Sequence, residues 1–196
     1  DKRWMVTWAS AVDEDGVELI RGNTTETRGS PGGVKGSGPS DKPAAESGPV
    51  DIVPAGPVVA TAHKRVPIGA SLPGLTKDVS LGQMTVFSGP GNWQSFHTNP
   101  DFALQCGLPD CVAQGLMSAC YISEMMTDFL GDGWRRSGKI NLAFIAAVYR
   151  GDVLTVGGRV NEKLKEDGTT RIVCEVWCEN QASKRVTVGT ASGLVR

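Results

Sequence analysis

This 196-residue chain has almost no net charge, no long apolar run and few histidines. Its 20 basic residues nearly balance its 21 acidic ones, so the net charge of −1 gives no electrostatic basis for binding nucleic acid or an anionic membrane. No apolar run approaches the roughly 18 residues that cross a bilayer, and the first residues do not form a signal peptide. We therefore expect neither nucleic acid nor a membrane as a partner.

Cysteine and histidine are too few and too irregularly spaced for a metal site. The five cysteines form no Cys-x-x-Cys pair and there are two histidines, so we expect no metal ligands. Cys174 and Cys178 fall on one face of a strand, too far apart along it to bond each other readily. We interpret the thiols as small buried hydrophobic residues of a reduced, cytoplasmic protein. The missing initiator methionine suggests a fragment or a processed product.

The amino-terminal part of the chain predicts a β-hairpin over residues 1–23. Trp4, Val6 and Trp8 alternate as in a strand, residues 13–16 have turn chemistry, and residues 17–20 form a returning strand. An isolated hairpin is marginal in water, so we expect it to pack on something else. Residues 24–66 are rich in Gly, Pro and Ser, which predicts a flexible linker before a domain over residues 67–196.

The remaining residues predict a helix surrounded by strands. Ser80 is a good N-cap for a short helix, and Pro100 begins another over residues 100–105. The longest helix covers residues 113–130 and is apolar on most sides, so we expect it to be largely buried. A strand precedes these helices and four follow them: residues 75–79, 140–149, 153–163, 171–178 and 185–195. This order predicts an α+β fold with an antiparallel sheet wrapped around the long helix.

Residues 171–190 resemble residues 3–24 in pattern. Each segment has a Trp-bearing strand, a polar turn and a second strand that ends in Gly followed by Thr or Asn. We interpret the amino-terminal hairpin as the last two strands of a preceding domain of the same kind, or as a hairpin that completes a partner's sheet. A chance likeness between two amphipathic hairpins is the alternative.

Four segments in the same order resemble the MaoC-like (R)-specific enoyl-CoA hydratases. Residues 88–103, Ser-Gly-Pro-Gly-Asn-Trp-Gln-Ser-Phe-His-Thr-Asn-Pro-Asp-Phe-Ala, are similar to that family's hydration motif. Residues 112–118 resemble its Ala-His-Gly-Leu/Met segment at the start of the central helix. Residues 144–155 resemble its Phe-x-x-Pro-Val-x-x-Gly-Asp-x-Leu junction, and residues 178–191 its closing strands. The resemblance covers more than half of the chain and implies the hot-dog fold.

This resemblance implies a hydratase or dehydratase acting on a 2-enoyl or 3-hydroxyacyl thioester of CoA, with acyl-carrier protein as the second choice and no further cofactor. His97 becomes the catalytic base and acid, because imidazole titrates in the useful range. The Gly115 N–H, at the start of a helix, becomes the donor to the enolate oxygen. Ser123 becomes a residue that orients a catalytic side chain. Close helix packing for Gly115, and a bond from Ser123 back to a helix carbonyl, are the alternatives.

Four further residues are assigned to substrate binding. Trp93 and Phe96 flank His97 and are candidates to line an acyl pocket, with core packing as the alternative. Gln114 and Leu116 lie at the start of the long helix, within the segment that resembles the family's.

The chain departs from the family five residues before His97, where Asn92 replaces the acidic residue. An amide holds a water molecule but does not accept its proton. Three explanations follow: His97 acts as the sole base, the site is inactive, or a carboxylate from elsewhere fills in, namely Asp101, Glu124 or Asp128.

Two other functions compete with the hydratase. A catalytically degenerate hot-dog subunit would bind acyl-CoA or support an active partner, and an acyl-CoA thioesterase on the same fold ranks third. For the hydratase we expect a homodimer, or pairing with a second hot-dog domain.

Overall fold

The computed structural model describes residues 3–12, 18–28, 56–89, 91 and 94–195. The chain divides into two compact units, Asp1–Asp41 and Lys42–Arg196, which are described separately. No helix among the described residues is long and apolar enough to cross a lipid bilayer.

The first unit contains the predicted hairpin. Strand β1 (Arg3–Val12) pairs antiparallel with β2 (Glu18–Arg28), and a register shift occurs near the turn, between Ala11 and Val12. Strand β2 continues five residues beyond the predicted end of the hairpin at residue 23. Three threonines in this extension, which favour strands, account for the difference.

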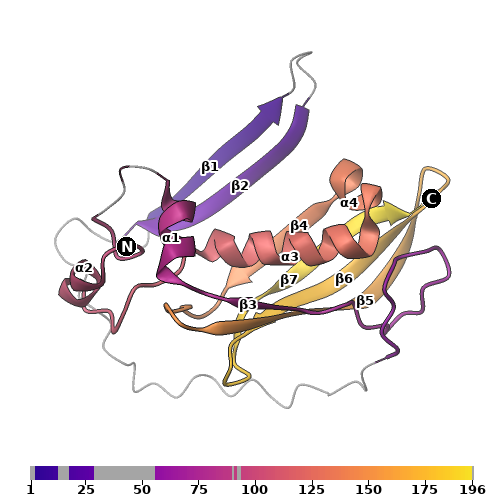
Figure 1. The fold of residues 1–196 in the computed structure, drawn as a ribbon. Coiled ribbons are helices and arrows are strands. Elements are labelled where there is room, and N and C mark those ends of the chain that lie inside the picture. Colours follow the sequence, from indigo (N-terminus) through magenta and orange to yellow (C-terminus); the bar gives the residue numbers. More distant parts are fainter. Residues whose placement is uncertain (1–2, 13–17, 29–55, 90, 92–93, 196) are drawn as a thin grey trace. The chain divides into compact units, whose positions relative to one another are not determined.

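The second unit contains a five-stranded antiparallel sheet that curves around one long helix (Figure 1). The strand order is β3-β5-β6-β7-β4. The strands are β3 (Leu75–Asp78), β4 (Lys139–Phe144), β5 (Val153–Glu166), β6 (Thr169–Glu179) and β7 (Arg185–Val195). This arrangement confirms the predicted α+β hot-dog fold.

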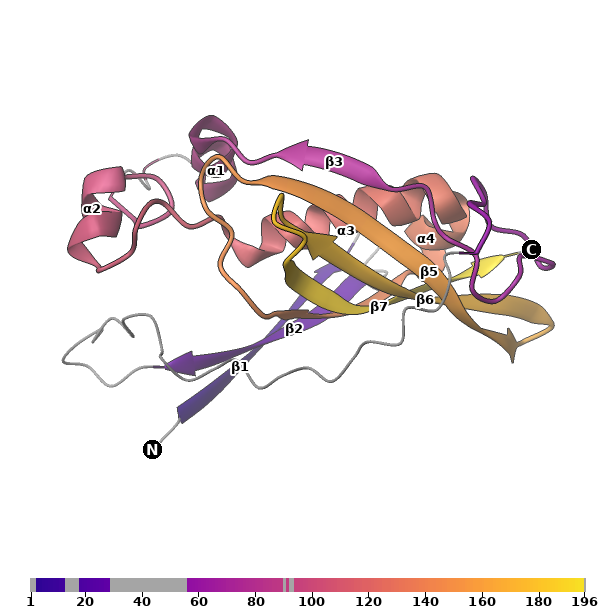
Figure 2. The same cartoon turned by 90° about the horizontal axis from the view of Figure 1, so that it is seen from below.

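Helix α3 (Gly115–Leu130) lies on one face of the sheet (Figure 2) and supplies much of the core. Its fully buried side chains come from positions that share one face: Ile122, Met125, Met126 and Phe129. The expectation of a largely buried helix holds for this face alone. Leu116 is 53% exposed and Cys120 is also exposed, because both lie on the side away from the sheet.

Two short helices lie beyond the amino-terminal end of α3 (Figure 1). Helix α1 (Leu81–Ser88) begins with the predicted cap: the Ser80 hydroxyl accepts from the Gln83 N–H, and Gln83 Oε1 accepts from the Ser80 N–H. Helix α2 (Pro100–Gln105) has its proline in the first turn, as predicted. The Asn99 side chain caps α2 by accepting from the Phe102 N–H at 3.1 Å, at the end of the loop that carries His97.

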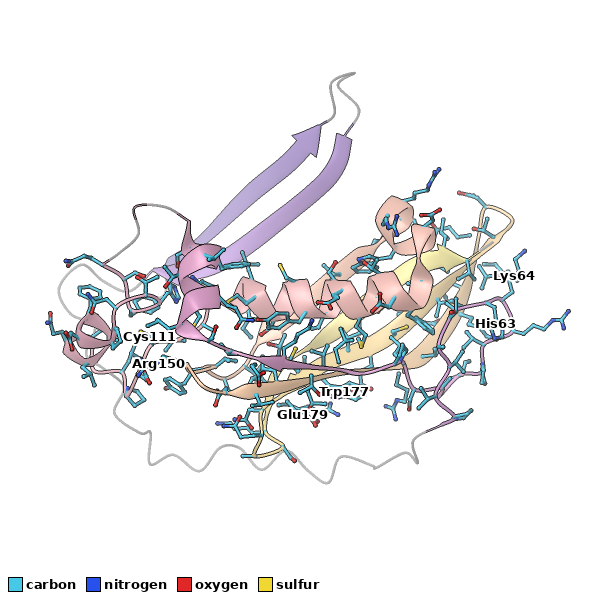
Figure 3. All side chains as sticks on the ribbon, viewed as in Figure 1. His63, Lys64, Cys111, Arg150, Trp177 and Glu179 are labelled. Carbon is cyan, nitrogen blue, oxygen red and sulfur yellow. The ribbon has the colours of Figure 1, made fainter. Side chains whose placement is uncertain are left out.

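The two faces of the sheet differ in character. Cys174 and Cys178 of β6 are fully buried on the face toward α3, as their spacing predicts. Trp177 and Glu179 lie on the other face (Figure 3), where the Arg185 guanidinium stacks 4.6 Å from the Trp177 ring. A glycine, Gly157, leaves room for this indole on the neighbouring strand.

Three features differ from the sequence-based expectation. Strand β4 ends at Phe144 instead of residue 149, because residues 148–150 pair with the segment before α3 and no longer with β7. Helix α4 (Asp132–Ser137) follows α3 directly after Gly131 and was not predicted. Residues 56–66, expected in the linker, contact the domain: the Ala62 N–H donates to the Phe129 carbonyl at 2.7 Å, and Val66 is fully buried.

Candidate active site

His97 lies in the loop between α1 and α2 and is held by the segment that leads into α3. Its Nδ1 lies 2.6 Å from the main-chain oxygen of Val112, and the Val112 N–H donates to the Phe96 carbonyl at 3.1 Å. A carbonyl oxygen accepts and never donates, so Nδ1 carries a proton. Neutral His97 is therefore the Nδ1–H tautomer, and its lone pair is on Nε2, where it is available to act as a base.

The segment that holds His97 is itself fixed to the loop after β4. Main-chain hydrogen bonds join residues 111–113 to residues 148–150: Ala113 N to Val148 O at 2.8 Å and Arg150 N to Cys111 O at 3.0 Å. The Asp110–Arg150 ion pair, at 3.0 Å, closes the same junction, near which Cys111 and Arg150 appear in Figure 3. Burial and, secondarily, the Asp110 charge raise the pKa of the Cys111 thiol, which disfavours a nucleophilic role.

Helix α3 begins at Gly115 without a side-chain cap. The N-cap residue, Gln114, makes no capping hydrogen bond, and among the described residues no hydrogen bond uses the Gly115 N–H. The partial positive charge of the helix terminus is therefore available to an acceptor. A Cβ atom at position 115 would lie 2.9 Å from the Phe144 ring, so the glycine also permits close packing.

A cavity of about 330 Å³ lies next to this helix start. Its lining is mostly aliphatic: Val112, Ala113, Gly115, Ser118, residues 144–148 and Thr187. Val112 thus lines the cavity and also holds His97 through its carbonyl oxygen. The cavity combines an apolar wall and a helix amino terminus, and His97, which is not among its lining residues, is hydrogen-bonded to one residue of that wall.

Gln114 contacts α1. Its Nε2 donates to the Ser88 Oγ at 2.5 Å and to the Met84 carbonyl at 3.2 Å. Because the Met84 oxygen is an acceptor, these contacts fix the orientation of the amide and leave Oε1 as the free acceptor. That oxygen is buried and has no hydrogen-bond partner in the structure. Gln114 therefore presents an unused acceptor beside the start of α3.

The other residues predicted to bind substrate lie in different surroundings. The Phe96 ring centroid is 4.1 Å from that of His97, and Phe96 is 38% exposed. Leu116 is exposed on the first turn of α3. Asn92 and Trp93 lie outside the described residues.

Ser123 makes its hydrogen bond with a neighbouring helix. Its Oγ accepts from the Trp134 Nε1 of α4 at 2.9 Å. This contact differs from both expectations, a bond to a catalytic side chain and a bond to a helix carbonyl. The contact ties two consecutive helices, α3 and α4, together. Trp134 was not predicted as a partner because α4 was not predicted.

Among the described residues, none of the three carboxylates proposed as substitutes for the missing acid is bonded to His97. Glu124 pairs with Lys77 at 2.6 Å, and Asp101 and Asp128 are exposed on α2 and α3. In the described part of the chain, no hydrogen bond or ion pair joins any of them to His97. The described part of the chain also contains no cluster of three or more His, Cys, Asp or Glu side chains that could hold a metal ion.

Two residues at the cavity were not recognised in the sequence. These residues are Phe144 and Thr187. Phe144 lies within a segment that resembles the family, and its neighbour Gly115, a glycine at the first position of a long helix, was a signal that another side chain packs closely there. Thr187 carried no signal, since a threonine in a strand reveals neither the face on which it lies nor its neighbours.

This combination of a hot-dog sheet, a central helix and a histidine anchored beside the helix start defines the class of domain. Residues 65–189 match the family model described as MaoC like domain, and the chain belongs to that family. The resemblance inferred from the sequence motifs is thereby confirmed. No match was found among curated proteins.

Several solved structures share the fold. The R-hydratase PhaJ1 from Pseudomonas aeruginosa is 25% identical, with a TM-score of 0.56, over 65% of this chain and 80% of that one. The (R)-hydratase from A. caviae involved in PHA biosynthesis is 18% identical, with a TM-score of 0.56, over 68% and 100%. The matched chain of the ChsH1-ChsH2 complex from Mycobacterium tuberculosis is 22% identical, with a TM-score of 0.54, over 66% and 99%.

Proposed function

We propose that the protein hydrates a 2-enoyl-CoA thioester, or dehydrates the corresponding 3-hydroxyacyl-CoA, with His97 as the base and acid. The hydrogen bond from His97 Nδ1 to the Val112 carbonyl carries this proposal, because it leaves the Nε2 lone pair as the base and ties the ring to Val112, a residue that lines the apolar cavity at the start of α3. Membership of a family with (R)-hydratases among its solved structures supports it.

In the hydration direction, His97 Nε2 takes a proton from water as the water oxygen bonds to C3 of the substrate. The C2=C3 electron pair shifts toward the thioester carbonyl, whose oxygen becomes negative and accepts a hydrogen bond from the Gly115 N–H. The imidazolium then delivers its proton to C2 while the carbonyl bond re-forms. Dehydration is the reverse, so a single histidine serves both proton transfers.

Gln114 supplies the acceptor that holds the water. Its Oε1 is buried, oriented by the contacts of Nε2 with Ser88 and Met84, and has no partner of its own. An amide oxygen accepts one O–H of the water and leaves the other for His97. In this scheme no carboxylate replaces the acidic residue that the family has at the position of Asn92.

The acyl chain occupies the aliphatic cavity. Residues 144–148 and Val112 form most of its wall, and about 330 Å³ suits a short to medium chain. Phe144 and Leu116 are 48% and 53% exposed at the start of α3, where the thioester enters.

The direct test is loss of the enoyl-thioester absorbance with crotonyl-CoA and its longer homologues. We expect His97→Ala to lower the rate by about 10²–10⁴-fold, the usual contribution of a positioned general base. The matched control is His63→Ala, since His63 is exposed on the loop before β3 (Figure 3) and accepts a hydrogen bond from the Arg65 N–H. No turnover by the wild type with any chain length, or equal rates for the wild type and His97→Ala, would refute the proposal.

The same assay separates the competing functions. Binding of acyl-CoA without turnover, with activity appearing after another chain is added, identifies a degenerate subunit. Release of the free CoA thiol identifies a thioesterase. Loss of the enoyl absorbance without thiol release is the result we expect.

We further propose that the domain pairs with a second hot-dog domain. Strand β4 is at one edge of the sheet, and among the described strands only β7 pairs with it. Ile140 and Phe144 of this strand are 42% and 48% exposed. One solved structure with this fold is a complex of two proteins, ChsH1 and ChsH2, which supports pairing with a different chain.

A further inference from the structure

One hydroxyl group on the cavity wall has no hydrogen-bond partner among the residues that the structure describes. Thr187 is fully buried on β7, and its Oγ1 contacts neither a donor nor an acceptor in the structure. Buried polar atoms are nearly always paired, because removing them from water costs free energy that only a new hydrogen bond recovers. An unpaired hydroxyl on the wall of a cavity therefore indicates a group that is paired when the cavity is filled.

The sheet register places this hydroxyl near the helix start. Thr187 is opposite Phe144 of β4 and opposite Cys178 of β6. Side chains of directly opposed residues lie on the same face of a sheet, so Thr187 shares the face toward α3 with Phe144. The Phe144 ring contacts Gly115, and all three residues line the cavity. Gly115 and Thr187 thus line one cavity, and among the described residues neither the Gly115 N–H nor the Thr187 hydroxyl has a hydrogen-bond partner.

Packing alone does not account for the hydroxyl. Valine has nearly the shape of threonine and would fill the same space without leaving a polar atom unpaired. The remaining side chains that line the cavity are apolar, apart from Ser118, whose main-chain oxygen accepts from the Cys178 thiol at 4.0 Å. A β-branched side chain in a strand is restricted at χ1, so the Thr187 hydroxyl is held in position before any ligand arrives.

We propose that Thr187 is a substrate-binding residue whose hydroxyl donates a hydrogen bond to the thioester carbonyl oxygen, alongside the Gly115 N–H. The inference rests on the proposed function for the identity of the ligand as an acyl thioester. Two donors, one from the helix terminus and one from the sheet, would fix the carbonyl oxygen from two sides. A neutral hydroxyl keeps this role at any pH at which the protein is folded.

The test measures binding of butyryl-CoA, a saturated thioester that cannot be hydrated, by titration calorimetry. We expect Thr187→Val to weaken binding by about tenfold, which corresponds to about 1.4 kcal/mol. Thr187→Ser keeps the hydroxyl and should remain within about threefold of the wild type. Thr190→Val is the matched control, since Thr190 is exposed on the same strand. The melting temperature of Thr187→Val should equal or exceed that of the wild type, because the unpaired hydroxyl is gone.

Equal affinities for the wild type and Thr187→Val would overturn the inference, as would a wild-type protein that does not bind butyryl-CoA. Parallel assays with crotonyl-CoA keep the two proposals separate. Wild-type protein that binds butyryl-CoA through Thr187 but does not consume crotonyl-CoA would refute the hydratase proposal and leave the role of Thr187 standing.

Discussion

At the scale of single residues, the contact between His97 and the Val112 carbonyl separates two roles of one ring. Nδ1 holds the loop, and Nε2, which has no hydrogen bond among the described residues, is the base in the proposed mechanism. An asparagine at position 97 places an N–H near the position of Nδ1 and has no atom at the position of Nε2. We therefore expect His97→Asn to keep the melting temperature within a few degrees of the wild type.

The same variant should lose about 10²–10⁴-fold in kcat/KM with crotonyl-CoA. Thermal denaturation and the absorbance assay check the two halves of this prediction on one preparation. Retained activity would mean that His97 serves the loop alone, and an unfolded variant would mean that asparagine does not replace the contact with Val112.

The two buried cysteines of β6 predict how stability changes in alkaline solution. Burial raises the pKa of the Cys174 and Cys178 thiols from the ordinary 9.0 to about 12. Between these values the folded protein keeps protons that the unfolded chain releases, so stability is intact below about pH 9 and falls as the pH rises toward 12. Each thiol contributes a slope of about 1.4 kcal/mol per pH unit in this window.

Urea denaturation at several pH values measures the total slope, and Cys174→Ala should lower it by about 1.4 kcal/mol per pH unit, whatever the variant costs in packing. A slope that is unchanged in Cys174→Ala would contradict the assignment. In the same structure Cys120 is exposed, so we expect it to react with iodoacetamide well before Cys174 and Cys178 do.

Single residues also show where sequence reasoning about the site ends. The sequence motif led to the proposal of His97 and Gly115 as catalytic groups because their types and spacing match the chemistry of a hydratase. The partners that orient them, Val112 and Phe144, act through a main-chain oxygen and through ring packing, which depend on the tertiary fold. The contact of Ser123 with Trp134 depends on a helix that no sequence pattern indicated.

At the scale of elements, two glycines test how closely the backbones pack. Gly189 of β7 is opposite Leu142 of β4, and a Cβ atom there would overlap the Asn141 carbonyl oxygen. We expect Gly189→Ala to destabilise the protein by about 1–3 kcal/mol, as overpacking does.

Gly82 provides the matched comparison. It lies in α1, it is exposed, and its added Cβ would have its nearest neighbour, the Ser80 Oγ, at 3.9 Å. Gly82→Ala should therefore stabilise the protein by about 0.5–1 kcal/mol through helix propensity. Urea denaturation measures both variants, and shifts of the same sign would contradict the proposed packing of β4 against β7.

Elements with strong local signals were predicted, and those fixed by tertiary contacts were not. The Ser80 cap, the proline of α2 and the alternation of β6 and β7 are local and agree with the structure. Strand β4 ends early because residues 148–150 pair with the segment before α3. Helix α4 is six residues long, which is too short to show a periodic pattern.

At the scale of the whole molecule, the exposed edge strand predicts an assembly. If β4 pairs with another hot-dog domain, the wild type should sediment as a dimer, or as a complex once its partner chain is present. Ile140→Lys places a charge on this edge and should shift the dimer toward the monomer. Val58→Lys is the control, since Val58 is 71% exposed and lies outside β4. Sedimentation velocity distinguishes these outcomes, and no effect of Ile140→Lys on a dimeric wild type would exclude β4 as the interface.

The sheet order also has a consequence for the route by which the chain folds. Strands β5, β6 and β7 are consecutive and adjacent, and the first pair is joined by a tight turn at Asp167 and Gly168, both with positive φ. Strands β3 and β4 pair with them across longer loops, whose closure costs more entropy. The three-stranded meander therefore forms early, and the cavity, built from β4 and the start of α3, is completed late. Substitutions around that cavity should then act mainly on the rate of unfolding, leaving the rate of folding almost unchanged.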